Sequence, residues 1–165
     1  MNIIFLDIDG VLNSVKYHTK EKNIKDISDY HLQMLAEIYH KCNAKIVLSS
    51  TWRELDCVEN ESCQKMYKYL LDELARYNME IISKTPVIEM DRPLEISTWL
   101  EEHGGKDSHN FVILDDDWSK EYYDKYDIGD HLVKTIYFCR EENEGGLQPE
   151  HVEKAIKILS GYKNK

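Results

Sequence analysis

The sequence predicts an α/β fold in which a doubly wound, mostly parallel sheet carries helices on both faces. Short apolar runs typical of buried strands alternate along the chain with segments whose apolar residues recur at helical spacing. The 165 residues, 42% of them hydrophobic, suffice for one core and are too few for two full ones, so we expect a single domain over residues 1–165. The expected strands are Ile3–Leu6, Lys45–Leu48, Met79–Ile82, Phe111–Leu114 and Thr135–Phe138.

Four helices are expected between and after these strands. Ser28 can cap the first, whose apolar residues then follow at spacings of three and four. Ser62 can cap the second. Pro93 begins a shorter third helix that ends near Gly104, and Pro149 begins the last. Helices in these places would cross from one strand to the next, which is the connection that a parallel sheet needs.

The composition excludes several classes of function. The net charge of −10 argues against a broad nucleic-acid-binding surface, which needs an excess of lysine and arginine. No apolar run approaches the roughly 20 residues of a membrane helix, and the chain begins with an expected strand rather than a signal segment. The four cysteines lack a CxxC pair, so we expect reduced thiols. These features predict a cytoplasmic protein without membrane association. No obligate protein partner is evident from the sequence.

Polar residues gather where the first four strands are expected to end. Ligands of doubly wound sheets bind beyond the carboxyl ends of the strands. Several carboxylates at one edge repel one another unless a divalent cation is bound, and oxygen ligands without cysteine or histidine favour Mg²⁺. A cation beside a free carboxylate suits phosphoryl transfer, in which the carboxylate attacks phosphorus and water then cleaves the acyl phosphate. In strand order, these residues are Asp7 and Asp9, Ser49 and Ser50, Ser83 and Lys84, and Asp115, Asp116 and Asp117.

Four segments together carry a resemblance to a known family. They read "FLDIDGVLN", "IVLSSTWR", "RPLEISTWL" and "FVILDDD", in this order along the chain. This pattern resembles the haloacid dehalogenase (HAD) superfamily of phosphotransferases, and more closely the HAD domain of Swiss Army Knife RNA repair proteins. The resemblance extends from residue 2 to about residue 159. It implies an HAD-like fold and a Mg²⁺-dependent phosphomonoesterase that forms an aspartyl-phosphate.

The resemblance implies a role for each polar residue of the first two segments. Asp7 would be the nucleophile and a metal ligand. Asp9 would be the general acid and later the general base, with its backbone carbonyl on the metal. Gly10 would permit a sharp turn into the following loop. Ser49 would hold a phosphoryl oxygen, and Ser50 is the alternative if the strand ends one residue later.

The family also has a basic residue and a late acidic pair. We favour Arg92 as the basic residue that offsets charge on the nucleophile and phosphate, and Lys84 is its rival. Asp115 and Asp116 match the acidic pair that completes the metal site. Asp117 is expected to be only a solvated member of an acidic stretch.

Two residues after the second strand leave alternatives open. Arg53 could grip a substrate phosphate with its guanidinium group, or it could brace the loop through a salt bridge. Trp52 is expected to be a packed aromatic side chain, with base stacking as the alternative.

The spacing of the segments predicts a minimal cap or none. The lysine-rich loop "SVKYHTKEKNIKDIS" and the segment from Glu54 to Tyr77 are each too short for a folded cap domain. An open site suits a bulky phosphorylated substrate such as a nucleic-acid end, and the loop lysines could contact flanking phosphates. A small-molecule nucleotidase or metabolite phosphatase and a non-catalytic phosphate-binding domain are the alternatives. A signalling receiver domain does not fit the order of the motifs. It would need its acidic pair on the first strand and a single phosphoacceptor on the third, whereas here DxDG comes first and the adjacent acidic pair comes late.

Overall fold

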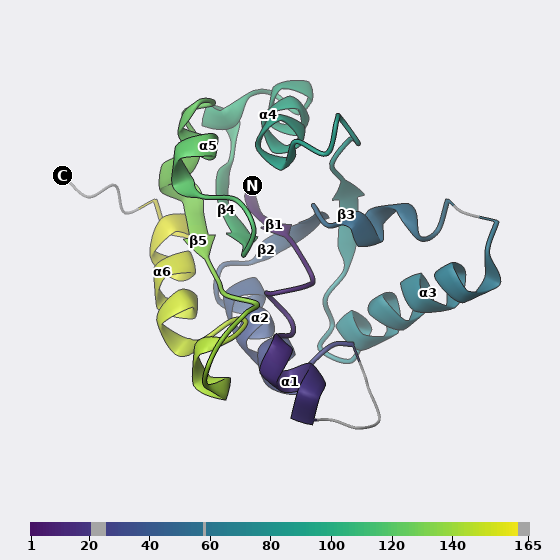
Figure 1. Ribbon diagram of the computed structural model, residues 1–165. Helices are drawn as coiled ribbons and strands as arrows, with labels where there is room; N and C mark the ends of the chain where they lie inside the picture. The colour runs from purple at the N-terminus through teal and green to yellow at the C-terminus, as the bar shows by residue number, and fades with distance from the viewer. Residues whose placement is uncertain (21–25, 58, 162–165) are drawn as a thin grey trace.

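The core of the molecule is one five-stranded parallel sheet, described here from a computed structural model that covers residues 1–20, 26–57 and 59–161 (Figure 1). The strand order is β3-β2-β1-β4-β5, and each neighbouring pair is parallel. The predicted α/β class with a doubly wound parallel sheet is therefore confirmed. The strands are β1 (Asn2–Leu6), β2 (Ala44–Leu48), β3 (Ile81–Lys84), β4 (Asn110–Asp115) and β5 (Leu132–Lys134).

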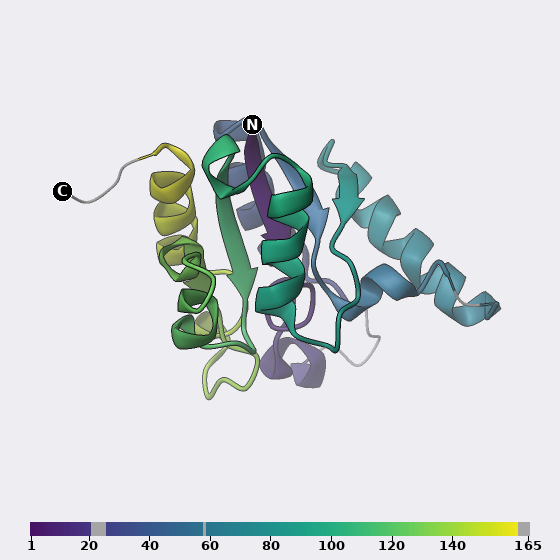
Figure 2. The ribbon, with the colours of Figure 1, turned by 90° about the horizontal axis from the view of Figure 1, so that it is seen from above.

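Helices cover both faces of the sheet. Alternate residues of the central strands point to opposite sides, and their apolar side chains pack against helices on each face. Ile4 and Leu6 of β1 belong to the core on the side of α2, α3 and α6, whereas Ile3 and Phe5 belong to the core on the side of α4 and α5. Figure 2 shows α2 and α4 on opposite sides of the sheet. The helices are α1 (Val15–Lys20), α2 (Asp29–Lys41), α3 (Glu61–Ala75), α4 (Arg92–Glu102), α5 (Lys120–Asp124) and α6 (Pro149–Leu159).

The register of the three central strands brings their carboxyl ends level. Leu6 of β1 pairs with Leu48 of β2 on one side and with Leu114 of β4 on the other. The next residue of each strand is therefore at the same edge. Asp7 donates its backbone N–H to Leu114 at 3.1 Å, and Ser49 donates its own to Leu6 at 2.8 Å. Asp7, Ser49 and Asp115, which follow the three paired leucines, thus become neighbours.

Two of the expected strands are misplaced. The last strand is Leu132–Lys134 rather than Thr135–Phe138, since the chain has already left the sheet at Thr135 and exposes Ile136 and Phe138 to solvent. The alternation of β-branched and aromatic residues therefore marks a loop at this point. The third strand begins at Ile81 rather than Met79, after a turn in which Asn78 has a positive φ of 55°.

The helix boundaries agree in part with the expectations. Ser28 precedes α2 as expected, although its side chain makes no capping hydrogen bond. The cap of α3 is Asn60 rather than Ser62, because the Asn60 side chain accepts from the backbone N–H groups of Ser62 and Cys63 at 2.9 and 3.2 Å. The short helices α1 and α5 were not expected, and α5 lies within the acidic stretch that reads as solvated.

The connections between strands are small. Within the described ranges, α1 and α2 connect β1 to β2, and a 3-10 turn, η1 (Thr51–Glu54), and α3 connect β2 to β3, so no cap domain is evident there. Residues 21–25 of the lysine-rich loop lie outside the described residues. In the described part of the chain, no helix is long and apolar enough to cross a membrane. That residues 1–165 form a single domain stays a prediction.

Candidate active site

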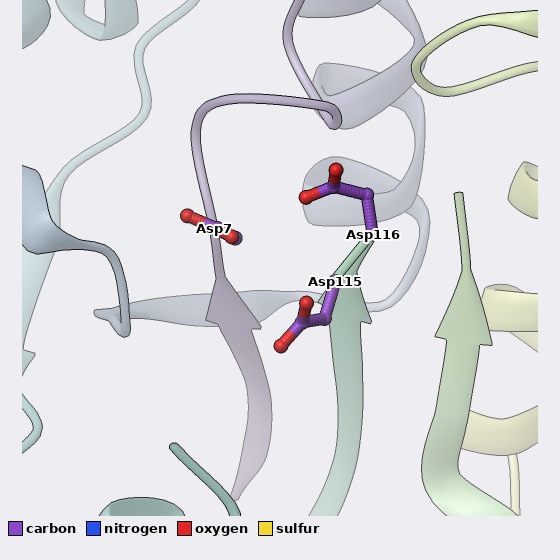
Figure 3. Close-up of side chains that lie close together, drawn as sticks. All are labelled: Asp7, Asp115 and Asp116. Carbon is purple, nitrogen blue, oxygen red and sulfur yellow. The ribbon is translucent and has the colours of Figure 1, made fainter. Parts of the chain in front are cut away.

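Three carboxylates meet at the carboxyl edge of the sheet (Figure 3). Asp7 follows β1, Asp115 ends β4, and Asp116 comes next, and each offers an oxygen within 4.8 Å of the others. Asp7 and Asp115 are buried, and Asp116 is half-buried. The sequence placed all three at this edge, and the structure brings them together.

The donor set of this cluster fits a hard divalent cation. The three ligands are carboxylate oxygens, the type that Mg²⁺ prefers, and negative charges so close together in a buried place need a positive counterpart. Asp9 lies outside the cluster, because its carboxylate is bonded elsewhere. Its predicted contact to the metal, through the backbone carbonyl, stays a prediction.

The surroundings of two of these carboxylates favour their neutral forms. Burial raises the pKa of Asp7 to about 6, against the opposing effect of the Arg92 guanidinium group. Burial, followed by the negative charge of Asp7, raises the pKa of Asp116 to about 7. Without a cation, the unfolded chain releases these protons at a lower pH than the folded protein does. The free energy of unfolding should therefore fall as the pH rises from about 4 through about 7.

The affinity for Mg²⁺ should accordingly increase with pH. A divalent cation held by this cluster would bind the deprotonated carboxylates, and below their raised pKa values it would have to displace protons. We expect the dissociation constant, measured by isothermal titration calorimetry, to be at least about ten-fold larger near pH 5.5 than near pH 8. An affinity that is constant over this range would contradict a site made of Asp7 and Asp116.

Arg92 supplies a buried positive charge beside the cluster. It is the first residue of α4, it is buried, and its Nη1 donates to Oδ2 of Asp7 and, at 3.3 Å, to Oδ2 of Asp115. Lys84 is directed elsewhere, because its Nζ donates to the backbone carbonyl of Arg53 at 2.9 Å and to Oδ2 of Asp56 at 2.5 Å. Of the two candidate basic residues, the structure therefore places Arg92 at Asp7.

Asp115 is held by donors from its own loop and from α5. Its Oδ1 accepts from the backbone N–H of Asp117 at 2.7 Å, and its Oδ2 accepts from the hydroxyl of Tyr123 at 2.5 Å. Burial and the charge of Asp115 hold the pKa of Tyr123 well above its usual value, so the hydroxyl remains a donor. Sequence reasoning missed Tyr123, because no local pattern shows which face of a short helix turns inward. The Asp117 side chain is exposed, as expected.

Gly10 allows the loop after β1 to pass close to the cluster of three carboxylates. Its φ of 76° is in the left-handed region, and a Cβ atom there would lie 2.1 Å from Cγ of Asp116. Its N–H donates to Oδ1 of Asn13 at 2.9 Å, and Nδ2 of Asn13 donates to Oδ1 of Asp9 at 2.9 Å. Asn13 is fully buried and was not among the predicted site residues, although it lies only four residues beyond Asp9.

The two serines after β2 differ in their surroundings. The Ser49 hydroxyl is buried and has no hydrogen-bond partner among the described residues, so it is available to a ligand at the sheet edge. Ser50 instead caps η1, because its Oγ accepts from the N–H of Trp52 at 3.3 Å. The structure therefore gives Ser49 the free hydroxyl and Ser50 a local structural contact.

Arg53 forms a buried ion pair with Glu95 of α4. Nη2 of Arg53 lies 2.8 Å from Oε1 of Glu95, and both side chains are almost fully buried. The same carboxylate oxygen accepts from the backbone N–H of Ile88 at 2.9 Å. The guanidinium group thus joins the loop after β2 to α4, which is the bracing arrangement of the two considered.

Replacing Arg53 should cost stability more than substrate affinity. Arg53→Ala would leave Glu95 charged and buried without its partner, and we expect the free energy of unfolding to fall by about 3–5 kcal/mol. Urea denaturation measures this loss. Lys45→Ala is the matched control, because it breaks an exposed pair with Glu80 and should cost at most about 1 kcal/mol. Unchanged stability together with a raised KM would instead assign Arg53 to substrate binding.

A comparison with protein families shows which family the chain belongs to. The model of the HAD domain in Swiss Army Knife RNA repair proteins matches residues 3–152, a range that contains every site residue described above. The chain belongs to this family. The resemblance predicted from the four sequence segments is confirmed, and membership of an HAD family supports a phosphatase-type function in general. Searches of curated proteins and of solved structures gave no match to this HAD domain.

Proposed function

We propose that this HAD domain is a Mg²⁺-dependent phosphomonoesterase that works through an aspartyl-phosphate on Asp7. One observation carries the proposal: a buried carboxylate that contacts an arginine lies within 4.8 Å of two further carboxylates at the carboxyl edge of a parallel sheet. A structural ion pair alone would not need three carboxylates for one guanidinium group. The cluster therefore favours a site for a cation and a phosphoryl group.

The chemistry needs two steps, and residues of the chain can serve each. In the first step a carboxylate oxygen of Asp7 attacks phosphorus, the bond from phosphorus to the leaving oxygen breaks, and Asp9 gives its proton to that oxygen. In the second step Asp9 takes a proton from water, the water oxygen attacks phosphorus, and the bond to Asp7 breaks. Asp9 ends with its proton restored, and phosphate is released.

The remaining residues would stabilise the phosphoryl group. Arg92 and the free hydroxyl of Ser49 would donate hydrogen bonds to its oxygens. Asp7, Asp115 and Asp116 would hold Mg²⁺, which, when bound, neutralises negative charge on the phosphoryl oxygens. Arg53, Ser50 and Lys84 would act on substrate only indirectly, since each is engaged in contacts within the chain.

We infer that the substrate is the phosphorylated end of an RNA strand. The family description supports a link to RNA repair. The loop after β5 adds support from this chain: it leaves the sheet at Thr135, which bonds to the backbone of Asp115, and it then exposes 84% of Phe138 and 47% of Ile136. An exposed aromatic side chain in a loop that begins at this edge suits base stacking. Because the chain is acidic overall, we propose that it contacts only the end of the RNA and not a long stretch of the strand.

The predicted cytoplasmic location also stays a proposal. All four cysteines are free, as expected for a reducing compartment. No obligate protein partner is proposed.

Phosphate release on matched substrates tests the proposed function. The wild-type protein is assayed with and without Mg²⁺ on a 3′-phosphorylated RNA oligonucleotide, on a 5′-phosphorylated one and on a mononucleotide. We expect Mg²⁺-dependent release that favours one oligonucleotide end, and Phe138→Ala should reduce that preference over the mononucleotide. Release from the mononucleotide alone would make the protein a nucleotidase. The absence of release from all three would favour a non-catalytic phosphate-binding domain.

A further inference from the structure

Trp52 is buried in the core but donates a hydrogen bond to Asp9. The side chain is only 4% exposed and belongs to the hydrophobic core on the α2 side of the sheet. Its ring Nε1–H nevertheless reaches the edge of the sheet and donates to Oδ2 of Asp9 at 3.0 Å. The other oxygen of Asp9 accepts from Asn13 at 2.9 Å. An exposed aspartate is thus held by one donor on each oxygen.

The indole ring is itself fixed in place by its neighbours. Trp52 lies in η1, its backbone N–H donates to Oγ of Ser50 at 3.3 Å, and its backbone carbonyl accepts from the N–H of Leu55 at 3.1 Å. The next residue, Arg53, is tied to α4 through the buried ion pair with Glu95. A large ring that is packed in the core and followed by an anchored residue has little freedom to move, so it can define the orientation of a surface carboxylate.

We propose that Trp52 is a positioning residue that fixes the carboxylate of Asp9 for proton transfer to the leaving oxygen. This inference rests on the proposed function, because it takes Asp9 as the general acid. An indole N–H suits the task because it only donates: it orients the carboxylate and cannot accept the proton that Asp9 must deliver. A freely rotating Asp9 would occupy the productive orientation for only part of the time.

Leaving-group dependence tests the proposal. A general acid matters most when the leaving oxygen is a poor leaving group, such as a ribose hydroxyl, and least for p-nitrophenol, which departs without protonation. Trp52→Phe keeps an aromatic ring and removes the N–H donor. We expect it to lower kcat/KM about ten-fold on the ribose phosphomonoester that the wild-type protein hydrolyses fastest, and less than about three-fold on p-nitrophenyl phosphate.

Trp99→Phe is a matched control. Trp99 is also buried, and its Nε1 donates to Oγ of Ser83 at 2.9 Å, away from the cluster of acidic residues. The Trp99→Phe variant loses an indole N–H donor and the same ring volume as Trp52→Phe. Any effect on activity that comes from weaker packing alone should therefore appear in both variants. We expect the ratio of the two substrates to stay at the wild-type value in Trp99→Phe.

The possible outcomes separate the inference from the function on which it rests. An equal loss on both substrates, or no loss, in Trp52→Phe would overturn the positioning role. If Trp52→Phe fails to fold, β-(3-benzothienyl)alanine at position 52 keeps the ring shape, replaces the N–H by sulfur and should give the same pattern. Asp9→Asn must show a larger loss with the same substrate dependence. If it does not, the general-acid role of Asp9 fails, and the proposal for Trp52 is overturned with it.

Discussion

Asp7→Asn should lower the rate of phosphate release by at least about 10⁴-fold while leaving the fold intact. An amide does not form the covalent bond to phosphorus, so the first step has no nucleophile. The fold should persist because asparagine has the same shape and can still accept the N–H of Ile8, which bonds to Oδ1 of Asp7 at 2.8 Å. Single-turnover phosphate release and thermal unfolding by circular dichroism measure the two effects.

Asp117→Asn is the control for this variant. It removes the same charge only two residues from Asp115, but its side chain is exposed. Its rate should stay within about two-fold of the wild-type rate. If Asp7→Asn kept most of the activity, the hydrolysis would not proceed through this carboxylate, and the covalent mechanism would have to be abandoned.

The sequence could predict the edge of the sheet because that edge depends on local patterns. Apolar runs fix where β1, β2 and β4 end, and parallel pairing then places Asp7, Ser49 and Asp115 side by side. The third strand lies two residues later in the chain than predicted, and this error did not affect the predicted position of the acidic residues. The fifth strand was misplaced because β-branched and aromatic residues also occur in an exposed loop.

The donors that hold the site could not be predicted in the same way. The hydroxyl of Tyr123 reaches Asp115 only because α5 turns one face toward the sheet, and the ring of Trp52 reaches Asp9 only because η1 follows Ser50. These contacts depend on how short helical segments are rotated, and that rotation is decided by tertiary packing. Motifs therefore identify the reacting groups, whereas the groups that orient them come from the structure.

Replacing Arg92 should affect activity and stability together. The guanidinium group contacts both Asp7 and Asp115 in a buried place, and Arg92→Ala would leave these two carboxylates without it. Lys134, which lies beside Asp116, would remain as a positive charge near the cluster. We expect phosphate release to fall about 10²–10³-fold, as for the loss of a fixed donor to a developing charge. In the absence of Mg²⁺, the free energy of unfolding should fall by about 3–5 kcal/mol. Arg92→Lys keeps the charge but not the planar fork, so its losses should be smaller.

Mg²⁺ should restore more stability to Arg92→Ala than it adds to the wild-type protein. The arginine and the cation would neutralise the same carboxylates. When the arginine is absent, more repulsion among these carboxylates remains for the cation to relieve. The rise in melting temperature on adding saturating Mg²⁺ should therefore be larger for the variant, while its activity stays low because the donor to the phosphoryl oxygens is still missing. Equal rises for the two proteins would mean that the cation binds away from Asp7 and Asp115. The three carboxylates would then be a structural cluster, and the metal site would have to be sought elsewhere on the chain.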